Sequence, residues 1–236
     1  MKLIKLITLW VLSLVQATLL GQSNFFEEAD AFFKQHVVEG RIDYSSIYEA
    51  PQELNNLITS IHSYSIRLDQ KNESLAFYIN TYNLLVIKNI IDHYPINSPM
   101  DIPGFFDEKS FLIANKALSL NNIENDIIRP IFKDPRIHFA LVCGAVSCPP
   151  IIPNAYFPDN VQEQLTMQTT TALNNTSFTI LDTSSLSLSQ IFNWYSIDFT
   201  TDSTNLIEFI NLYRTITIPL NTRISFYPYD WQLNKQ

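Results

Sequence analysis

Apolar residues recur at helical spacing along much of the chain. In segment 72–93 they form one stripe, which predicts a long helix that ends before Pro95. The stripe consists of Leu75, Tyr78, Ile79, Tyr82, Leu85, Val86 and Ile90. Shorter stretches of similar periodicity predict further helices over 24–37, 54–62, 120–132, 159–173, 190–198 and 205–214. The protein is therefore expected to be mostly helical.

A smaller part of the chain carries the pattern of short strands. Phe111–Ile113 and Ala117–Leu118 flank Asn115-Lys116, which predicts a hairpin, and Phe178–Leu181 with Leu186–Leu188 predict a second one. A last strand is expected over 224–228, and 41–44 is expected to be extended. Together these elements predict an α+β fold: a mostly helical single domain with a small mixed or antiparallel sheet.

The segment Arg136–Pro150, RIHFALVCGAVSCPP, contains both cysteines of the chain. Its first part, Ile137–Val142, is apolar and rich in branched and aromatic residues, so it predicts a buried strand. This strand would end at Cys143. Side chains at strand ends are held by a rigid scaffold and stay open to ligands, so this is the first place to look for a site.

The N-terminus has the pattern of a secretory signal peptide. Lys2 and Lys5 precede the apolar run LITLWVLSLV, and small or polar residues follow at 21–23. We expect residues 1–22 to be removed and residues 23–236 to form the single domain. The apolar run is short for a membrane span, so the mature protein is expected to be secreted, or periplasmic in a bacterium, without integral membrane association.

Charge and motif content exclude several classes of function. The formal charge is −8, and it becomes −10 if Lys2 and Lys5 leave with the leader, which argues against nucleic acid as a partner. The sequence has no HExxH, no phosphate-binding glycine loop and no GxSxG. Four scattered histidines and one cysteine pair give no recognisable zinc set. Neither a metal nor another cofactor is expected.

Several ordered segments of the chain resemble a known family, the domain-of-unknown-function family 547. The resemblance rests on GRIDY, LAFYINTYNLLVIKNIIDHYP, LSLNNIENDIIRP, RIHFALVCGAVSCPP, FNWYSIDF and YDWQLN, which span almost the whole mature chain. The family name implies no activity. Its members are similar, at a distance, to papain-like and transglutaminase-like cysteine enzymes, which implies such a core layout and a cysteine-dependent chemistry as hypotheses for this chain.

The two cysteines allow two interpretations. In an exported protein Cys143 and Cys148 most simply form a disulfide, with Gly144 permitting the tight turn. Alternatively Cys143 is a free nucleophile, next to a glycine that leaves room for a substrate, while Cys148 anchors the loop. Residue patterns alone leave both possibilities open.

His138 and Glu124 are the candidate partners of a nucleophilic Cys143. On an extended strand the side chains of His138 and Cys143 would lie about 16 Å apart on opposite faces, so a direct pair requires the loop to fold back. His138 could equally be a buried structural histidine. Glu124 either orients His138 or is the third residue of a helix capped by Asn121.

Two further groups of residues are expected to be structural. Asn80 and Asn83 lie beside the apolar stripe, where they would pin the loop after Val142 or, less simply, stabilise an oxyanion. The aromatic and acidic residues near the C-terminus are expected in core packing and turns, with a carbohydrate or peptide platform as the alternative. They are Trp194, Tyr195, Asp198, Tyr229, Asp230 and Trp231.

Two functions follow from these residues. In the first, the protein is a thiol-dependent hydrolase or acyl transferase acting on amide bonds, with Cys143, His138 and Glu124 as catalytic residues. In the second, it is a non-catalytic binding module with a Cys143–Cys148 disulfide and an aromatic groove. Its partner would be a small peptide, a protein or a glycan.

Overall fold

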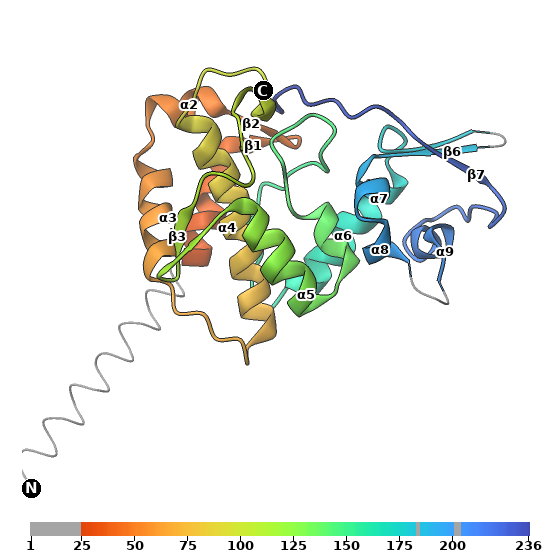
Figure 1. The fold of residues 1–236 in the computed structure, drawn as a ribbon, viewed down its shortest axis with the longest axis horizontal. Helices are drawn as coiled ribbons and strands as arrows, with labels where there is room; N and C mark the ends of the chain where they lie inside the picture. The colour runs from red at the N-terminus through yellow and green to blue at the C-terminus, as the bar shows by residue number, and fades with distance from the viewer. Residues whose placement is uncertain (1–24, 183–184, 201–203) are drawn as a thin grey trace, which may run out of the picture.

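The structure is a computed structural model that describes residues 25–182, 185–200 and 204–236 (Figure 1). The predicted signal peptide, residues 1–22, lies outside this part of the chain. Among the described residues, no helix has the length and apolar character needed to cross a membrane.

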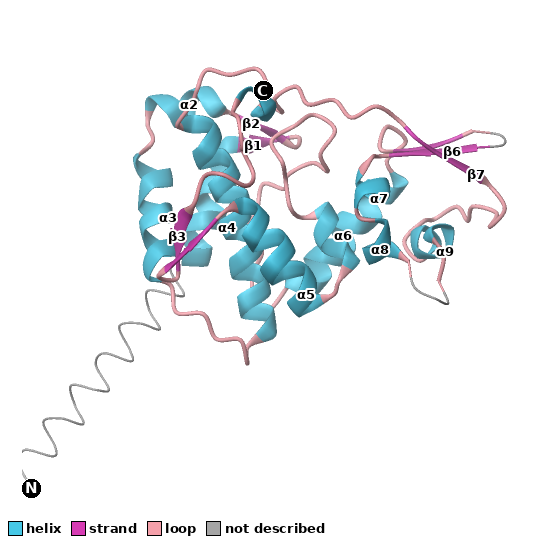
Figure 2. Ribbon diagram, in the orientation of Figure 1, coloured by secondary structure: helices cyan, strands magenta, loops and turns pink. Residues whose placement is uncertain are grey.

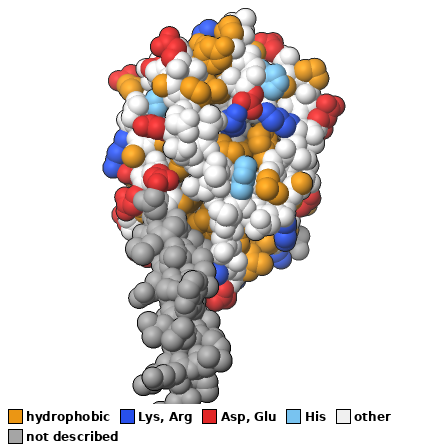
Figure 3. Space-filling view, turned by 90° about the vertical axis from the view of Figure 1, so that its left-hand side faces the viewer, with side chains coloured by type: hydrophobic (Ala, Val, Ile, Leu, Met, Phe, Trp, Pro, Cys, Tyr) orange, Lys and Arg blue, Asp and Glu red, His pale blue; other side chains and the backbone are white. Residues whose placement is uncertain are grey.

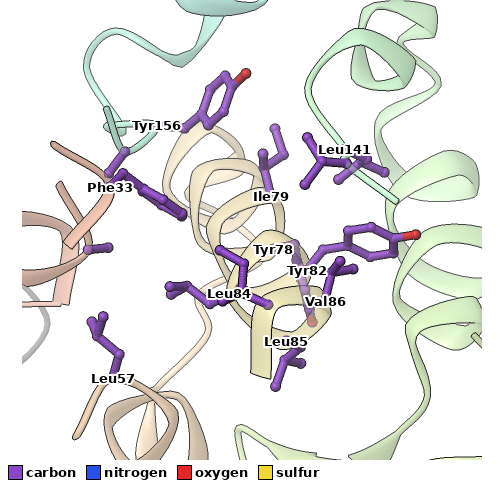
Figure 4. Close-up of a cluster of buried hydrophobic side chains, with 14 of the residues drawn as sticks. Phe33, Leu57, Tyr78, Ile79, Tyr82, Leu84, Leu85, Val86, Leu141 and Tyr156 are labelled. Atoms are coloured by element: carbon purple, nitrogen blue, oxygen red, sulfur yellow. The ribbon is translucent and has the colours of Figure 1, made fainter. Parts of the chain in front are cut away.

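Helix α4 (Lys71–Ile91) is the centre of the larger hydrophobic core. The sequence predicted one apolar stripe, but the helix is buried on nearly every side because neighbouring elements surround it. Figure 4 shows Phe33, Leu57, Leu141 and Tyr156 around this helix. Its polar residues must therefore find partners inside the protein.

Residues 25–36 are helical. The other helical elements are α2 (Tyr44–Glu49), α3 (Gln52–Ser63), η1 (Pro99–Asp101), η2 (Asn122–Ile128), α5 (Arg129–Phe132), η3 (Pro135–Phe139), α6 (Val161–Asn174), α7 (Ile191–Trp194), α8 (Ser196–Phe199) and α9 (Leu206–Asn211). Of these, η2 is a π-helix, and η1 and η3 are 3-10 helices.

The strands are short and lie in separate small sheets (Figure 2). They are β1 (Val37–Val38), β2 (Arg41–Ile42), β3 (Phe111–Ile113), β4 (Lys116–Leu118), β5 (Thr179–Leu181), β6 (Ser185–Leu188) and β7 (Arg223–Phe226). Antiparallel pairing joins β1 to β2, β3 to β4 and β5 to β6, whereas β7 is parallel to β6. The expected α+β class and both expected hairpins are confirmed.

Two predicted helices differ in detail. Segment 120–132 contains the π-helical η2, which continues directly into α5 with Pro130 in the first turn of α5. Asn121 is itself helical and makes no side-chain cap, so the capping interpretation of Glu124 is wrong. Segment 190–198 is divided at Tyr195 into α7 and α8.

The predicted strand Ile137–Val142 is wrong. Asp134 caps the 3-10 helix η3 there by accepting a hydrogen bond from the Arg136 backbone N–H. The following residues form a loop whose polar backbone groups are satisfied by Asn83, which donates to Ala140 O at 3.0 Å and accepts from Val142 N at 3.0 Å. The side chain of Asn83 thus makes backbone hydrogen bonds that neighbouring strands would make if this buried segment were a strand.

The fold has two hydrophobic clusters that meet at η3. Ile137 belongs to the larger cluster around α4, whereas Phe139 belongs to a smaller cluster formed mainly by residues 172–218. His138 lies between them in the chain. The segment after β7 then runs back across the molecule to β2 (Figure 1), where Lys235 bridges to Ile42. This return places C-terminal side chains above the loop that follows η3.

The surface carries charges of both signs. On the face shown in Figure 3, acidic and basic side chains lie in small groups among hydrophobic and uncharged ones.

Candidate functional site

A cavity of about 300 Å³ lies where distant parts of the chain come together. Helix α4, η2, η3, the cysteine loop, α7 and the C-terminal segment all contribute side chains. The lining residues are Tyr82, Phe106, Asn121, Glu124, Asn125, His138, Leu141, Cys143, Cys148, Ile191, Trp194, Tyr195, Tyr229 and Trp231. All three residues predicted as catalytic, Cys143, His138 and Glu124, therefore border one cavity.

Cys143 and Cys148 form a disulfide in the wall of this cavity. The hydroxyl oxygen of Tyr229 lies 3.2 Å from Cys143 Sγ and 3.3 Å from Cys148 Sγ. The C-terminal segment thus covers the disulfide directly. In this state Cys143 has no thiol and cannot act as a nucleophile.

Gly144 allows the turn between the two cysteines. Its φ is +78°, and a Cβ at this position would lie 2.7 Å from Ile90 Cδ1 and 3.3 Å from Pro99 Cγ. The side that a Cβ would occupy faces the hydrophobic core. The glycine is therefore explained by the turn and by close packing, and not by access for a substrate.

His138 is held by a carboxylate that the sequence did not indicate as a partner. Its Nε2 lies 2.7 Å from Asp198 Oδ2, and Arg129 binds the same carboxylate through Nε at 2.6 Å and Nη2 at 2.9 Å. Burial raises the pKa of Asp198, but the hydrogen bonds from His138 and Arg129 outweigh it and hold that pKa well below its usual range. Asp198 is thus an anion that fixes the imidazole ring.

Glu124 is buried next to the other side of the imidazole. Its Oε1 lies 3.9 Å from His138 Nδ1, and Tyr82 donates a hydrogen bond to its Oε2 at 3.3 Å. The pKa of the nearby Tyr195 is raised mainly by burial and further by the Glu124 carboxylate. His138 thus lies between two carboxylates, those of Glu124 and Asp198.

Aromatic rings form one wall of the cavity. The centroids of Trp194 and Tyr229 lie 4.8 Å apart, those of Tyr229 and Trp231 4.7 Å, and those of Trp194 and Trp231 6.0 Å. Trp194 remains 48% exposed. Tyr195 stacks on His138 at 4.1 Å on the same side of the molecule. These residues were expected to be core packing, but they border an open cavity instead.

The asparagines of α4 act as structural pins, as expected. Asn83 holds the loop after η3, and Asn80 forms an equivalent pair of hydrogen bonds with the backbone N–H and C=O of Tyr156. Each amide uses both a donor and an acceptor in this way. Neither residue lines the cavity, so the oxyanion role has no support from the geometry.

Sequence reasoning missed Asp198 as the partner of His138 and the cavity role of Tyr82, and it gave a binding platform of Trp194, Tyr229 and Trp231 only as an alternative. Most of them lie in the segments FNWYSIDF and YDWQLN, which the family resemblance had already marked. That resemblance was the one available signal, because local spacing says nothing about contacts between residues sixty or more positions apart. Among the described residues, no group of histidine, cysteine and acidic side chains is arranged to hold a metal ion.

Comparison with known proteins gives one match. The family model described as a protein of unknown function, DUF547, matches residues 66–172, which is about half of the chain and less than the almost complete coverage expected from the motifs. The matched range contains Tyr82, Glu124, His138 and both cysteines, whereas Asp198 and the aromatic wall lie beyond it. No curated protein matches the chain. No solved structure matches it either.

Proposed function

The chain belongs to the DUF547 family, whose description assigns no activity, and we propose that it is an exported binding protein that holds a small ligand in the cavity beside Glu124 and His138. The ligand would be part of a peptide, protein or glycan. In this proposal the disulfide shapes the cavity wall and takes no part in covalent chemistry.

The bond between Cys143 and Cys148 is the observation that carries the proposal. Both sulfurs line the cavity, and the hydroxyl of Tyr229 lies against them. A protein that relied on a thiolate would have to reduce this bond first. The aromatic wall, in contrast, is ready to contact a ligand in the state observed.

Export is part of the proposal. The order of basic, apolar and small residues in segment 1–22 supports it, and so does the disulfide, because such bonds persist mainly in oxidising compartments. We expect mass analysis of protein from the native source to find the first 22 residues missing. An intact Met1 on the accumulated protein would overturn this part of the proposal.

A second candidate function has one specific observation in its favour. Cys143, His138 and Glu124 border one cavity, and Asp198 orients the histidine as the third member of a cysteine enzyme's triad would. After reduction by a dithiol, Cys143 would attack an amide carbonyl carbon and pass its proton to His138. The histidine would protonate the leaving amine, and water would then hydrolyse the thioester.

Thiol trapping separates the two functions. Protein taken from its native compartment and treated with iodoacetamide without reductant should carry no label and should weigh two hydrogens less than the reduced chain. Label on Cys143 in this experiment would overturn the binding proposal in favour of the thiol enzyme. A panel of peptides and glycans, followed by tryptophan fluorescence, then tests whether the unlabelled protein binds a ligand.

A further inference from the structure

The charge of the cavity lining indicates which ligands it suits. Among its lining residues, Glu124 is the one with a carboxylate, and none is a lysine or arginine. Glu124 is 8% exposed, and among the described residues no lysine or arginine forms an ion pair with it; the imidazole of His138 lies 3.9 Å away. A buried carboxylate without a full positive partner is costly, so a cation entering here would be stabilised.

The neighbouring arginine does not fill this role. Arg129 makes two hydrogen bonds to Asp198, which balances its charge, and it lies over the ring of Tyr195 at 5.0 Å. The second nitrogen of His138 is likewise used by Asp198. Arg129 is thus paired with Asp198, and the Glu124 carboxylate borders the cavity without a lysine or arginine partner among the described residues.

The aromatic wall suits the same kind of ligand. Trp194, Tyr229 and Trp231 lie with their centroids 4.7 to 6.0 Å apart and all border the cavity. The electron-rich faces of tryptophan and tyrosine attract cations, and the attraction grows when water is excluded. Tyr195 already accepts Arg129 in this way.

We propose that the ligand group bound in this cavity is a small organic cation, a substituted ammonium that pairs with Glu124 and contacts the rings of Trp194, Tyr229 and Trp231. This inference rests on the proposed binding function and specifies the class of ligand. An anionic group would meet Glu124 with no lysine or arginine in the lining. A neutral group would leave the carboxylate desolvated and without a cation.

The chain provides its own reporter for a test. Its three tryptophans are Trp10, in the predicted leader, and Trp194 and Trp231, which both line the cavity. Tryptophan fluorescence of the exported protein, titrated with choline, should change and saturate. The neutral isostere 3,3-dimethylbutan-1-ol, which has the same shape without the charge, should bind at least about tenfold more weakly.

Substitutions test whether Glu124 is the residue that favours binding of the cation. Glu124→Gln removes the charge with little change in shape, and it should weaken choline binding about tenfold or more. The matched control is Asp126→Asn, which removes one carboxylate from the same π-helix at an exposed position that does not line the cavity. It should leave choline binding unchanged. If Glu124→Gln does not fold, the comparison of choline with its neutral isostere on the unmodified protein still decides.

The outcomes distinguish this inference from the function on which it rests. Equal binding of choline and the neutral isostere, or saturable binding of a neutral glycan alone, would overturn the proposal that the ligand is an organic cation. Either result would still agree with the proposed binding function. If choline, the glycans and the peptides all fail to bind, the binding function itself is overturned.

Discussion

His138 Nε2 and Asp198 Oδ2 lie 2.7 Å apart, although sixty positions separate the two residues in the chain. The contact joins η3, which lies between the two hydrophobic clusters, to α8, whose Phe199 belongs to the smaller one. Because Arg129 binds the same carboxylate, one acidic side chain connects three segments around the back of the cavity.

Substitution of Asp198 should therefore weaken the fold as well as the site. Asp198→Asn keeps the shape but removes the charge-assisted hydrogen bonds to His138 and Arg129, so we expect a loss of about 1 to 2 kcal/mol in unfolding free energy near neutral pH. Urea denaturation measures it. Asp69→Asn, at an exposed position, is the control and should change little.

The stability that the Asp198 carboxylate contributes should fall as the pH falls, and Asp198→Asn tests this. The pKa of Asp198 is lowered in the folded protein, so its contribution is complete above the unfolded value of about 3.9 and is lost as the pH falls toward the lower folded pKa. The stability difference between the unmodified protein and Asp198→Asn should thus shrink between about pH 5 and about pH 3. A difference that stays constant over this range would rule out the carboxylate as its source.

The sequence predicted features that depend on residues close to one another in the chain. The α4 helix and both hairpins follow from short periodic patterns, and the pairing of Cys143 with Cys148 is possible because Gly144 can turn. These features need no knowledge of the remainder of the fold.

Features that depend on contacts between residues far apart in the chain could not be predicted from the sequence. The apolar run after Arg136 was expected to be a strand. Its own residues do not reveal that it is a 3-10 helix and a loop, buried between two hydrophobic clusters and hydrogen-bonded by the side chain of Asn83. The aromatic wall depends on the C-terminal segment crossing back over the cysteine loop, as the contacts of Tyr229 with the sulfurs show. Residues on such a segment look like ordinary core positions until the crossing is known.

The burial of Phe139 predicts a large effect on stability. Phe139 is fully buried, and its ring lies within 6.2 Å of the rings of Phe178, Phe192 and Phe199, centroid to centroid. Phe139→Ala should cost about 3 to 5 kcal/mol, since it leaves a cavity in the smaller cluster. A loss within about 0.5 kcal/mol in urea melts would contradict this packing.

Gly144 offers a test of the turn between the cysteines. Gly144→Ala places a Cβ 2.7 Å from Ile90 Cδ1 at a φ of +78°, so we expect a loss of about 1 to 3 kcal/mol. Ile90→Val removes that Cδ1. In the Ile90→Val background the added cost of Gly144→Ala should be smaller, because the closest contact is gone and only the strained backbone and the 3.3 Å contact with Pro99 Cγ remain. An equal cost in both backgrounds would show that the contact with Ile90 does not matter.

The Cys143–Cys148 disulfide determines how the losses in unfolding free energy on substituting each cysteine should combine. If the bond stabilises the protein as one unit, Cys143→Ser and Cys148→Ser should each cost about 2 kcal/mol, since either change releases the same short loop.

The double variant Cys143→Ser/Cys148→Ser should then cost no more than either single variant, because the cross-link can be lost only once. Urea denaturation without reductant measures all three, and reduction of the unmodified protein should lower its stability to the same level. A different result is expected if Cys143 is a free nucleophile. Cys143→Ser would then leave stability within about 0.5 kcal/mol of the unmodified protein, because a catalytic thiol contributes little to packing, and the binding proposal would have to be abandoned.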